Sequence, residues 1–402
     1  MGRGRVRTPA LLAAAALALT ACGNGDGGTA QAPEPTSTGP TSTGPTSTVG
    51  LDEATRAHLQ RAFEHSFATE IAGTQTPGAV AFVEVGDAEW VSTLGVADVA
   101  SQEPMTPDRK FRIASVTKTF VATAILELVD EGQLALDDPL ERFLSGIAGG
   151  ESITLRDLLA MSSGVWSFTS DEALIARFDA DPMLPWTVDD TIDLVREHDA
   201  DFAPGVEVAY SDSNYVLLGR ILEDVTRRPI REVIEERVLE PLGLTETEFP
   251  ADDEPGVPAP AAVGYLPTDG ELRPVTDINP TFAWAAGAMT STASDLVRWA
   301  AELTDGTLLS PELQAQRLQA RRFTGVDVDY GYGLGVMNTK DMYGHDGGIV
   351  GSGVIAMRYP AEDATFVVLV NSGSNFDNAS IDIFNALLGE LFPEQVTLPT
   401  GR

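Results

Sequence analysis

A serine and a lysine three residues apart are the first candidates for catalysis. The segment SVTK at residues 115–118 opens a stretch in which apolar residues recur at helical spacing up to a glycine, which predicts a helix over 115–132. Residues i and i+3 share a helix face, so the Lys118 amine can reach the Ser115 hydroxyl. A serine needs an adjacent base to become a good nucleophile, and a lysine that has lost its proton can act as one. The alternative is that Ser115 caps the helix and Lys118 lies on the surface.

The scarcity of lysine favours the catalytic interpretation. Of the 26 basic residues, 23 are arginine, and the only lysines are Lys110, Lys118 and Lys340. Lysine can lose its proton in a protein, whereas arginine cannot. A chain that almost always uses arginine thus has a lysine at the position where titration would matter.

A second candidate is the segment YSDSNY at residues 210–215, which follows a turn and precedes an apolar helix. The Tyr210 phenol could relay a proton if it lies near a lysine ammonium group. The alternative is that Ser211 or Asp212 caps the helix and Tyr210 packs on the surface.

A third candidate is the segment YGHDGG at residues 343–348, which contains His345, Gly347 and Gly348 and precedes a predicted strand. Its glycines would let a substrate or another backbone approach closely, and its N–H groups could bind an oxyanion. The alternative is a simple glycine-rich turn that enters the strand.

Elements at both ends of the chain must position these motifs. Alternating and apolar patterns predict strands at 78–85 and 90–96 and again at 349–359 and 365–371. The predicted helices cover 52–71, 154–161, 189–198, 213–227, 230–239 and 376–391. Strands at both ends with helices between them predict an α/β (α+β) fold, an antiparallel sheet flanked by helices beside a largely helical part. The first strands would then pair with the last across nearly 300 residues.

Taken together, the three motifs resemble those of the serine β-lactamase and penicillin-binding superfamily. Tyr210 follows Ser115 by 95 residues, and His345 follows Tyr210 by 135 residues. The likeness is greatest to the class C branch and to the secreted D-alanyl-D-alanine carboxypeptidases of actinobacteria, and it extends over residues 51–390. It includes FRIA at 111–114, LVDEGQL at 128–134, LLAMSSG at 158–164, EPLGL at 240–244, WAAGA at 284–288 and YGLG at 332–335.

This resemblance implies a role for each residue. Ser115 would be acylated, Lys118 would take its proton, and Tyr210 would relay protons to the leaving group and activate water for deacylation. His345 would polarise the site together with Gly347. The N–H groups of Ser115 and Gly348 would form an oxyanion hole, Asp212 and Trp284 would contact substrate, and no metal or organic cofactor is implied. The implied fold is a sheet with helices on both faces beside an all-helical subdomain, with the site between them.

Departures from the family pattern bear on the substrate. Asp212 stands where the family usually has asparagine, so the amide donor is lost, and an ionised carboxylate would help to keep Lys118 charged. Met337 and Asp346 stand where the family carboxypeptidases have an arginine and a hydroxyl that hold the substrate carboxylate. The expected substrate is a small peptide, ester or β-lactam, which in the carboxypeptidase interpretation derives from the cell wall. The alternatives are an esterase or amidase acting on a neutral acyl substrate, a β-lactamase, or a binding protein that is acylated but turns over slowly.

The N-terminus predicts export. Residues 1–21 combine three arginines with a short apolar run, and the following Leu-Thr-Ala-Cys-Gly resembles a bacterial lipobox with Cys22 as the lipidated residue. The alternative is an ordinary signal peptide. Residues 22–50 are rich in Thr, Ser, Gly and Pro, which predicts a flexible tether, and 51–397 is expected to form one hydrolase domain. The expected location is the outer face of the cell membrane, to which only the lipid would attach the protein.

Composition excludes several other classes of protein. The chain of 402 residues has a net charge of −34 and a pI of about 4.2, which argues against binding to nucleic acid or to anionic lipid. Four scattered histidines lack metal-ligand spacing, and a single cysteine cannot form an intrachain disulfide.

Overall fold

The computed structural model describes residues 49–395 except 75, 269, 326–328 and 374–378. The predicted signal peptide, Cys22 and all but the last two residues of the predicted tether lie outside the described residues. Within the described part of the chain, no helix is long and apolar enough to cross a membrane.

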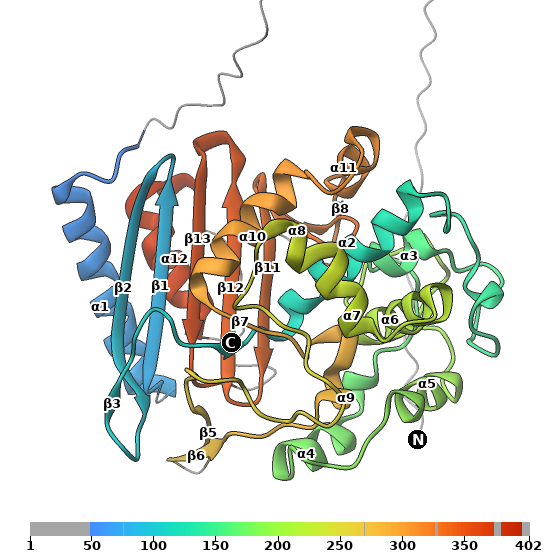
Figure 1. The fold of residues 1–402 in the computed structure, drawn as a ribbon, viewed down its shortest axis with the longest axis horizontal. Coiled ribbons are helices and arrows are strands. Elements are labelled where there is room, and N and C mark those ends of the chain that lie inside the picture. The colour runs from blue at the N-terminus through green and yellow to red at the C-terminus, as the bar shows by residue number, and fades with distance from the viewer. Residues whose placement is uncertain (1–48, 75, 269, 326–328, 374–378, 396–402) are drawn as a thin grey trace, which may run out of the picture. The chain divides into compact units, whose positions relative to one another are not determined.

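An antiparallel sheet of nine strands dominates the part of the chain that the structure describes, in the order β3-β2-β1-β13-β12-β11-β10-β9-β8 (Figure 1). At its centre β1 (Gly78–Val85) pairs with β13 (Ala364–Val370), with Ala79 opposite Val370. Both strands are rich in valine, and nearly all of their residues are buried because helices cover both faces of the sheet. The predicted pairing of the first strands with the last is confirmed.

The other strands of this sheet are β2 (Ala88–Asp98), β3 (Glu103–Pro104), β8 (Arg321–Arg322), β9 (Tyr330–Tyr332), β10 (Met337–Thr339), β11 (Met342–Ile349) and β12 (Ser352–Tyr359). Two small sheets are formed by the pairs β4 (Phe111–Arg112) with β7 (Thr290–Ser291) and β5 (Gly264–Thr268) with β6 (Glu271–Val275).

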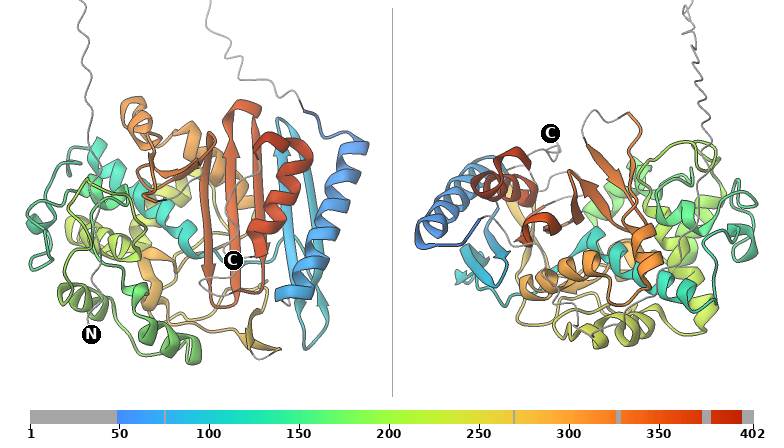
Figure 2. Two further views of the ribbon diagram at one scale, coloured as in Figure 1. Left: turned by 180° about the vertical axis from the view of Figure 1, so that it is seen from behind. Right: turned by 90° about the horizontal axis from the view of Figure 1, so that it is seen from above.

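Helices cover both faces of the main sheet. The terminal helices α1 (Glu53–Thr74) and α12 (Ala379–Leu391) lie side by side on one face, and α10 (Ala293–Asp305) covers the other (Figure 2). Leu59, Phe63 and Phe67 of α1 recur every four residues and are buried between these helices and the sheet. The predicted mixed fold with helices on both faces of an antiparallel sheet is confirmed.

A largely helical region continues beyond the β11 side of the sheet, and α2 (Thr117–Asp130) runs between this region and α10 (Figure 1). Phe120 of α2 stacks on Trp299 of α10 with 3.9 Å between ring centroids. The remaining helices are α3 (Leu155–Leu159), α4 (Glu172–Ala180), α5 (Val188–Arg196), α6 (Asp212–Thr226), α7 (Ile230–Ile234), α8 (Glu240–Leu242), α9 (Pro280–Ala283) and α11 (Pro311–Arg317). Single turns of 3-10 or π helix occur at Ala114–Val116, Leu140–Arg142, Phe168–Ser170, Glu235–Leu239, Trp284–Ala286, Pro360–Glu362 and Pro393–Gln395.

The glycine-rich segment 343–348 differs from what its own residues predict, although the family resemblance implies a strand position for His345. It lies inside β11, and the strand predicted from 349 begins only at Ser352, after a hairpin turn at Val350 and Gly351. Gly351 has a φ of +83°, a backbone conformation that favours glycine. Glycines weaken the local strand signal, but pairing with β12 along the whole segment imposes the strand conformation.

Candidate active site

Ser115 lies in a 3-10 turn (Ala114–Val116) that leads into α2, so the predicted helix over 115–132 begins two residues later, at Thr117. Ala114 has a φ of +43°, and such strain costs on the order of 1–3 kcal/mol and tends to occur at functional sites. Neither the turn nor α2 has a side-chain cap. Ser115 therefore does not serve as a helix cap, and its hydroxyl faces Lys118 instead.

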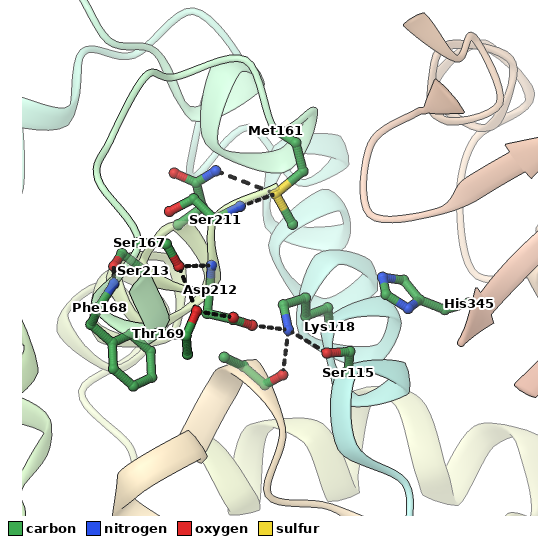
Figure 3. Close-up of polar contacts among 12 residues, drawn as sticks. Ser115, Lys118, Met161, Ser167, Phe168, Thr169, Ser211, Asp212, Ser213 and His345 are labelled. Atoms are coloured by element: carbon green, nitrogen blue, oxygen red, sulfur yellow. Dashed lines mark hydrogen bonds and ion pairs between the residues drawn. The ribbon is translucent and has the colours of Figure 1, made fainter. Parts of the chain in front are cut away.

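Lys118 is fully buried and has three polar neighbours (Figure 3). Its Nζ lies 2.9 Å from the Ser115 hydroxyl, 2.6 Å from the carbonyl oxygen of Ala286 and 2.7 Å from the Asp212 carboxylate. As an ammonium group, Lys118 donates to all three neighbours. As a neutral amine it donates to the Ala286 carbonyl and Asp212, and its lone pair then faces the Ser115 hydroxyl. This geometry suits a base for Ser115.

Two opposing effects act on the proton of Lys118. Burial lowers the pKa of Lys118, because a charged amine loses its hydration, while the carboxylates of Asp212 and Asp346 oppose this shift. Burial is the larger effect, so the neutral form that a base requires is more accessible than in a free lysine.

Asp212 begins α6 and is held firmly in place. One carboxylate oxygen contacts Lys118, the other accepts a hydrogen bond of 2.8 Å from the Thr169 hydroxyl, and its backbone N–H donates to the Ser167 hydroxyl at 3.0 Å (Figure 3). The carboxylate thus forms an internal ion pair where the family usually has an amide.

Tyr210 lies on the wall of the same site, with its ring centroid 5.1 Å from the Lys118 Nζ. Loss of hydration and the charge of Asp212 raise the pKa of Tyr210 well above its usual value, although a hydrogen bond with Ser115 opposes the shift. Tyr210 therefore keeps its proton at neutral pH and is placed to donate it.

His345 lies behind Tyr210 rather than in the cavity, with 6.1 Å between their ring centroids. Its Nδ1–H donates to the carbonyl of Asp346, so its Nε2 accepts a hydrogen bond of 2.9 Å from the Tyr332 hydroxyl. Burial, together with the charge of Lys118, lowers the pKa of His345 to about 3. His345 is therefore neutral, and its ring packs beside Tyr210 and Tyr332, outside the lining of the cavity.

The edge of β11 comes close to the nucleophile. A Cβ at Gly347 would lie 2.8 Å from the Ser115 nitrogen and 2.8 Å from the Ile113 oxygen, so only glycine permits this approach. Strand β10 pairs with β11 only as far as Gly344, and beyond that residue Gly347 and Gly348 line the cavity. The strand edge thus faces the cavity beside Ser115, where the expected oxyanion hole would lie.

The cavity itself has a volume of about 450 Å³. Six aromatic side chains line it. Phe168, Phe178 and Phe282 come from the helical side, where Phe178 and Phe282 stack at 3.8 Å. Tyr210 precedes α6, whereas Phe323 and Tyr330 lie at the β8–β9 edge of the sheet, together with Met337 of β10 and Asp346 of β11. No group of three potential metal ligands occurs among the residues that the structure describes.

Trp284 does not have its expected position. It is buried, and its ring packs where a Cβ on Gly219 of α6 would collide with it, while its neighbours Ala283 and Ala286 line the cavity. The structure therefore corrects the expected substrate contact of Trp284, because the indole is turned into helix packing. The motifs also gave no indication of Phe168, Thr169, Phe178, Phe282, Phe323 and Tyr330, which lie in segments without any local signature of a site.

Comparison with known proteins decides the family. The family model described as Beta-lactamase matches residues 59–390. This chain belongs to the Beta-lactamase family. It is a serine hydrolase of the group that includes the penicillin-binding proteins, as the motifs predict.

Relatives in this family carry several names. The chain is 29% identical over 361 residues to penicillin-binding protein 4 of Amycolatopsis lactamdurans, across 83% of this chain and 90% of that protein. It is 26% identical to the D-aminopeptidase of Brucella ovis, across 82% of this chain but only 62% of that enzyme's length.

Solved structures extend the likeness. A D-stereospecific amidohydrolase from Streptomyces sp. is 31% identical with a TM-score of 0.74, and the match covers 84% of this chain and 98% of that one. The D-amino acid amidase from Ochrobactrum anthropi SV3, complexed with D-phenylalanine, is 25% identical with a TM-score of 0.72, over 83% and 98% of the two chains.

Proposed function

We propose that this protein hydrolyses amide bonds of small D-amino acid derivatives, such as amides or short peptides, through an acyl-Ser115 intermediate. The observation that carries the proposal is the cavity: it combines the Ser115–Lys118 pair with an aromatic lining and a carboxylate at Asp346. Among its described lining residues there is no arginine or lysine to hold a substrate carboxylate. The names of the amidohydrolase and amidase relatives support the amide bond and the D configuration.

The reaction begins when the Ser115 hydroxyl attacks the substrate carbonyl and its proton passes to Lys118. The N–H groups of Ser115 and Gly348 stabilise the resulting oxyanion, and each such donor contributes about 2.7–4 kcal/mol in comparable sites. Tyr210 then donates its proton to the departing nitrogen and regains one from Lys118. The C–N bond breaks, and the acyl group remains on Ser115.

Deacylation follows the same path in reverse. Water enters where the amine has left, gives a proton towards Tyr210 and Lys118, and attacks the ester of Ser115. The acid product leaves, and Ser115 recovers its proton. In this scheme His345 does not change its protonation state, because its pKa of about 3 lies far below neutral pH.

A second candidate is a D-alanyl-D-alanine carboxypeptidase of cell-wall peptides. The similarity to penicillin-binding protein 4, which covers 90% of that protein, favours it. The carboxylate of Asp346 opposes it, because it would repel the free C-terminal carboxylate of such a substrate.

A direct assay separates these functions. Purified protein is incubated with D-phenylalanine amide, L-phenylalanine amide, a D-Ala-D-Ala peptide, a p-nitrophenyl ester and a penicillin, and product release is measured. We expect faster release of ammonia from the D-amide than from the L-amide, and Ser115→Ala should retain less than about 10⁻³ of the rate. Hydrolysis of the ester alone would favour an esterase and contradict the proposal.

We also propose that the protein is anchored by a lipid at Cys22 on the outer face of the membrane. The basic and apolar N-terminus and the small residues before Cys22 support this location. Cys22→Ser should move the protein from the membrane fraction to the soluble fraction. Wild-type protein that is found entirely in the medium, without lipid mass on its N-terminus, would contradict the anchor.

A further inference from the structure

Asp346 stands apart from the other charged groups of the cavity. It lines the cavity, and its side chain is 31% exposed. Its nearest basic side chain is His345, whose Nδ1 lies 3.8 Å from the carboxylate, and that imidazole is neutral. An aspartate that faces a substrate cavity beside an uncharged neighbour is available to a ligand.

Lys118 does not neutralise Asp346. The three hydrogen-bonding positions of its ammonium group are directed at Ser115, Ala286 and Asp212, and the Asp212 carboxylate already balances its charge. Lys118 acts on Asp346 only through the longer-range attraction that opposes the raised pKa of this aspartate. The cavity thus has one negative charge more than its described residues balance.

The surroundings of Asp346 also favour a cation. Tyr330 lies close enough for the charge of Asp346 to raise the pKa of its phenol further, and its ring stacks on Phe323 with 4.8 Å between centroids. The Tyr330 hydroxyl contacts the Met337 sulfur at 3.6 Å. A carboxylate next to aromatic rings and a thioether is a surface that attracts an ammonium group and repels a carboxylate.

We propose that Asp346 binds a primary ammonium group of the substrate and selects substrates that carry one near the scissile bond. This inference rests on the proposed amide hydrolysis and adds the chemical class of the substrate. The ammonium could come from two sources: the α-amino group of the acyl part, as in a D-aminoacyl amide, or an amino group on the leaving amine. The chemistry at Asp346 is the same for both.

The experiment uses two matched pairs of compounds, in each of which a methyl group replaces the ammonium. The first pair is D-phenylalanine amide and the analogue with a methyl group in place of the α-ammonium, in the same configuration. The second pair is the 2-aminoethyl amide and the propyl amide of N-acetyl-D-phenylalanine. We measure kcat/KM of all four with the wild type, with Asp346→Asn, and with Asp341→Asn as a control that removes one exposed charge from the β10–β11 turn.

In at least one pair we expect the kcat/KM of the ammonium compound to be about tenfold higher than that of its methyl partner, which corresponds to about 1.4 kcal/mol. Asp346→Asn should reduce this ratio to nearly one, and Asp341→Asn should retain it. The pair that responds identifies the source of the ammonium. Equal rates within both pairs in the wild type, or a preference that survives in Asp346→Asn, would overturn the assignment.

Calorimetric titration keeps the inference testable if no amide is cleaved. The same four compounds are titrated into Ser115→Ala and into Ser115→Ala with Asp346→Asn, and the ratio of Kd values within each pair is compared. Tighter binding of an ammonium compound that depends on Asp346 would support the subsite even if the proposed reaction is wrong. Turnover without any dependence on Asp346 would instead retain the proposed reaction and reject the subsite.

Discussion

Two aspartates reach the same cavity from different parts of the fold, and their surroundings differ. Asp212, at the start of α6, contacts Lys118 at 2.7 Å and accepts a hydrogen bond from Thr169. Asp346, on β11, has neutral His345 as its nearest basic side chain, and partial loss of hydration at its 31% exposed side chain raises its pKa to about 6. The first carboxylate is part of the internal structure of the site, whereas the second is open to a ligand.

This difference shows that residue type alone does not determine what a charge does in a cavity. Both aspartates replace residues that are neutral in the family pattern, and both add negative charge near Lys118. Only their partners distinguish them. The ion pair with Lys118 neutralises the charge of Asp212, whereas the charge of Asp346 has no paired cation and is only weakly offset by Lys118.

The largest loss of activity is expected when Lys118, the ion-pair partner of Asp212, is replaced. Lys118→Arg keeps a positive charge beside Asp212 but cannot accept the Ser115 proton, so kcat/KM should fall by about 10³-fold or more. Lys118→Ala should be similarly inactive, and steady-state assays of both variants check this. Substantial activity in the arginine variant would show that the ion pair, and not proton transfer, is what the site requires of Lys118.

Replacing each aspartate with asparagine should change stability in opposite directions. Asp212→Asn leaves buried Lys118 without its charge partner and should lower the free energy of unfolding at pH 7 by about 1–3 kcal/mol. Asp346→Asn removes a carboxylate that is costly to ionise in the folded protein and should raise the free energy of unfolding by about 1–2 kcal/mol. Urea unfolding at pH 7 measures both changes.

The increase in the free energy of unfolding caused by Asp346→Asn should depend on pH. The folded pKa of about 6 lies above the ordinary value of 3.8 for an aspartate, so ionisation destabilises the fold increasingly from pH 4 to pH 6 and by a constant amount above pH 6. The two proteins should therefore differ most at pH 7–8 and become similar below pH 4. If Asp346→Asn stabilises the protein equally at pH 4 and pH 8, the stabilisation comes from packing and not from the loss of a charge.

The smallest effect is expected in substrate selection. The wild type should cleave a D-Ala-D-Ala peptide with an amidated or esterified C-terminus about tenfold better than the free acid, because Asp346 repels the carboxylate. Asp346→Thr combined with Met337→Arg should shift the preference towards the acid, as kcat/KM for the matched pair would show. A wild type that prefers the acid by tenfold would restore the carboxypeptidase interpretation.

The sequence could predict the Ser115–Lys118 pair, because a spacing of three residues near a helix start fixes its geometry locally. Resemblance to a family could point to Tyr210, Asp212 and the strand with His345. It could not reveal that His345 is neutral, since this depends on burial and on the Tyr332 hydroxyl supplied by another strand.

The sequence also could not predict which side chains line the cavity. Phe168 and Tyr330 lie more than 160 residues apart, and only the packing of the helical region against the sheet brings them to one cavity. The same packing turns Trp284 inwards while its neighbour Ala283 faces the site. The order of the main strands could be predicted in outline, but the strand conformation of 343–348 arises from pairing with β12 and not from its own glycine-rich sequence.

The pairing of β1 with β13 has a consequence for how the chain folds. Ala79 needs Val370 as its partner, so the centre of the sheet cannot close until almost the whole chain is available. Contacts of such long sequence separation slow folding, and until they form, the hydrophobic edge of β1 is exposed to other chains. During synthesis Ser115 is among the early residues of the fold, yet the strand edge beside it comes from residues 347–348. Catalytic competence should therefore arise late, and truncation before β13 should yield an aggregating chain rather than a partly active enzyme.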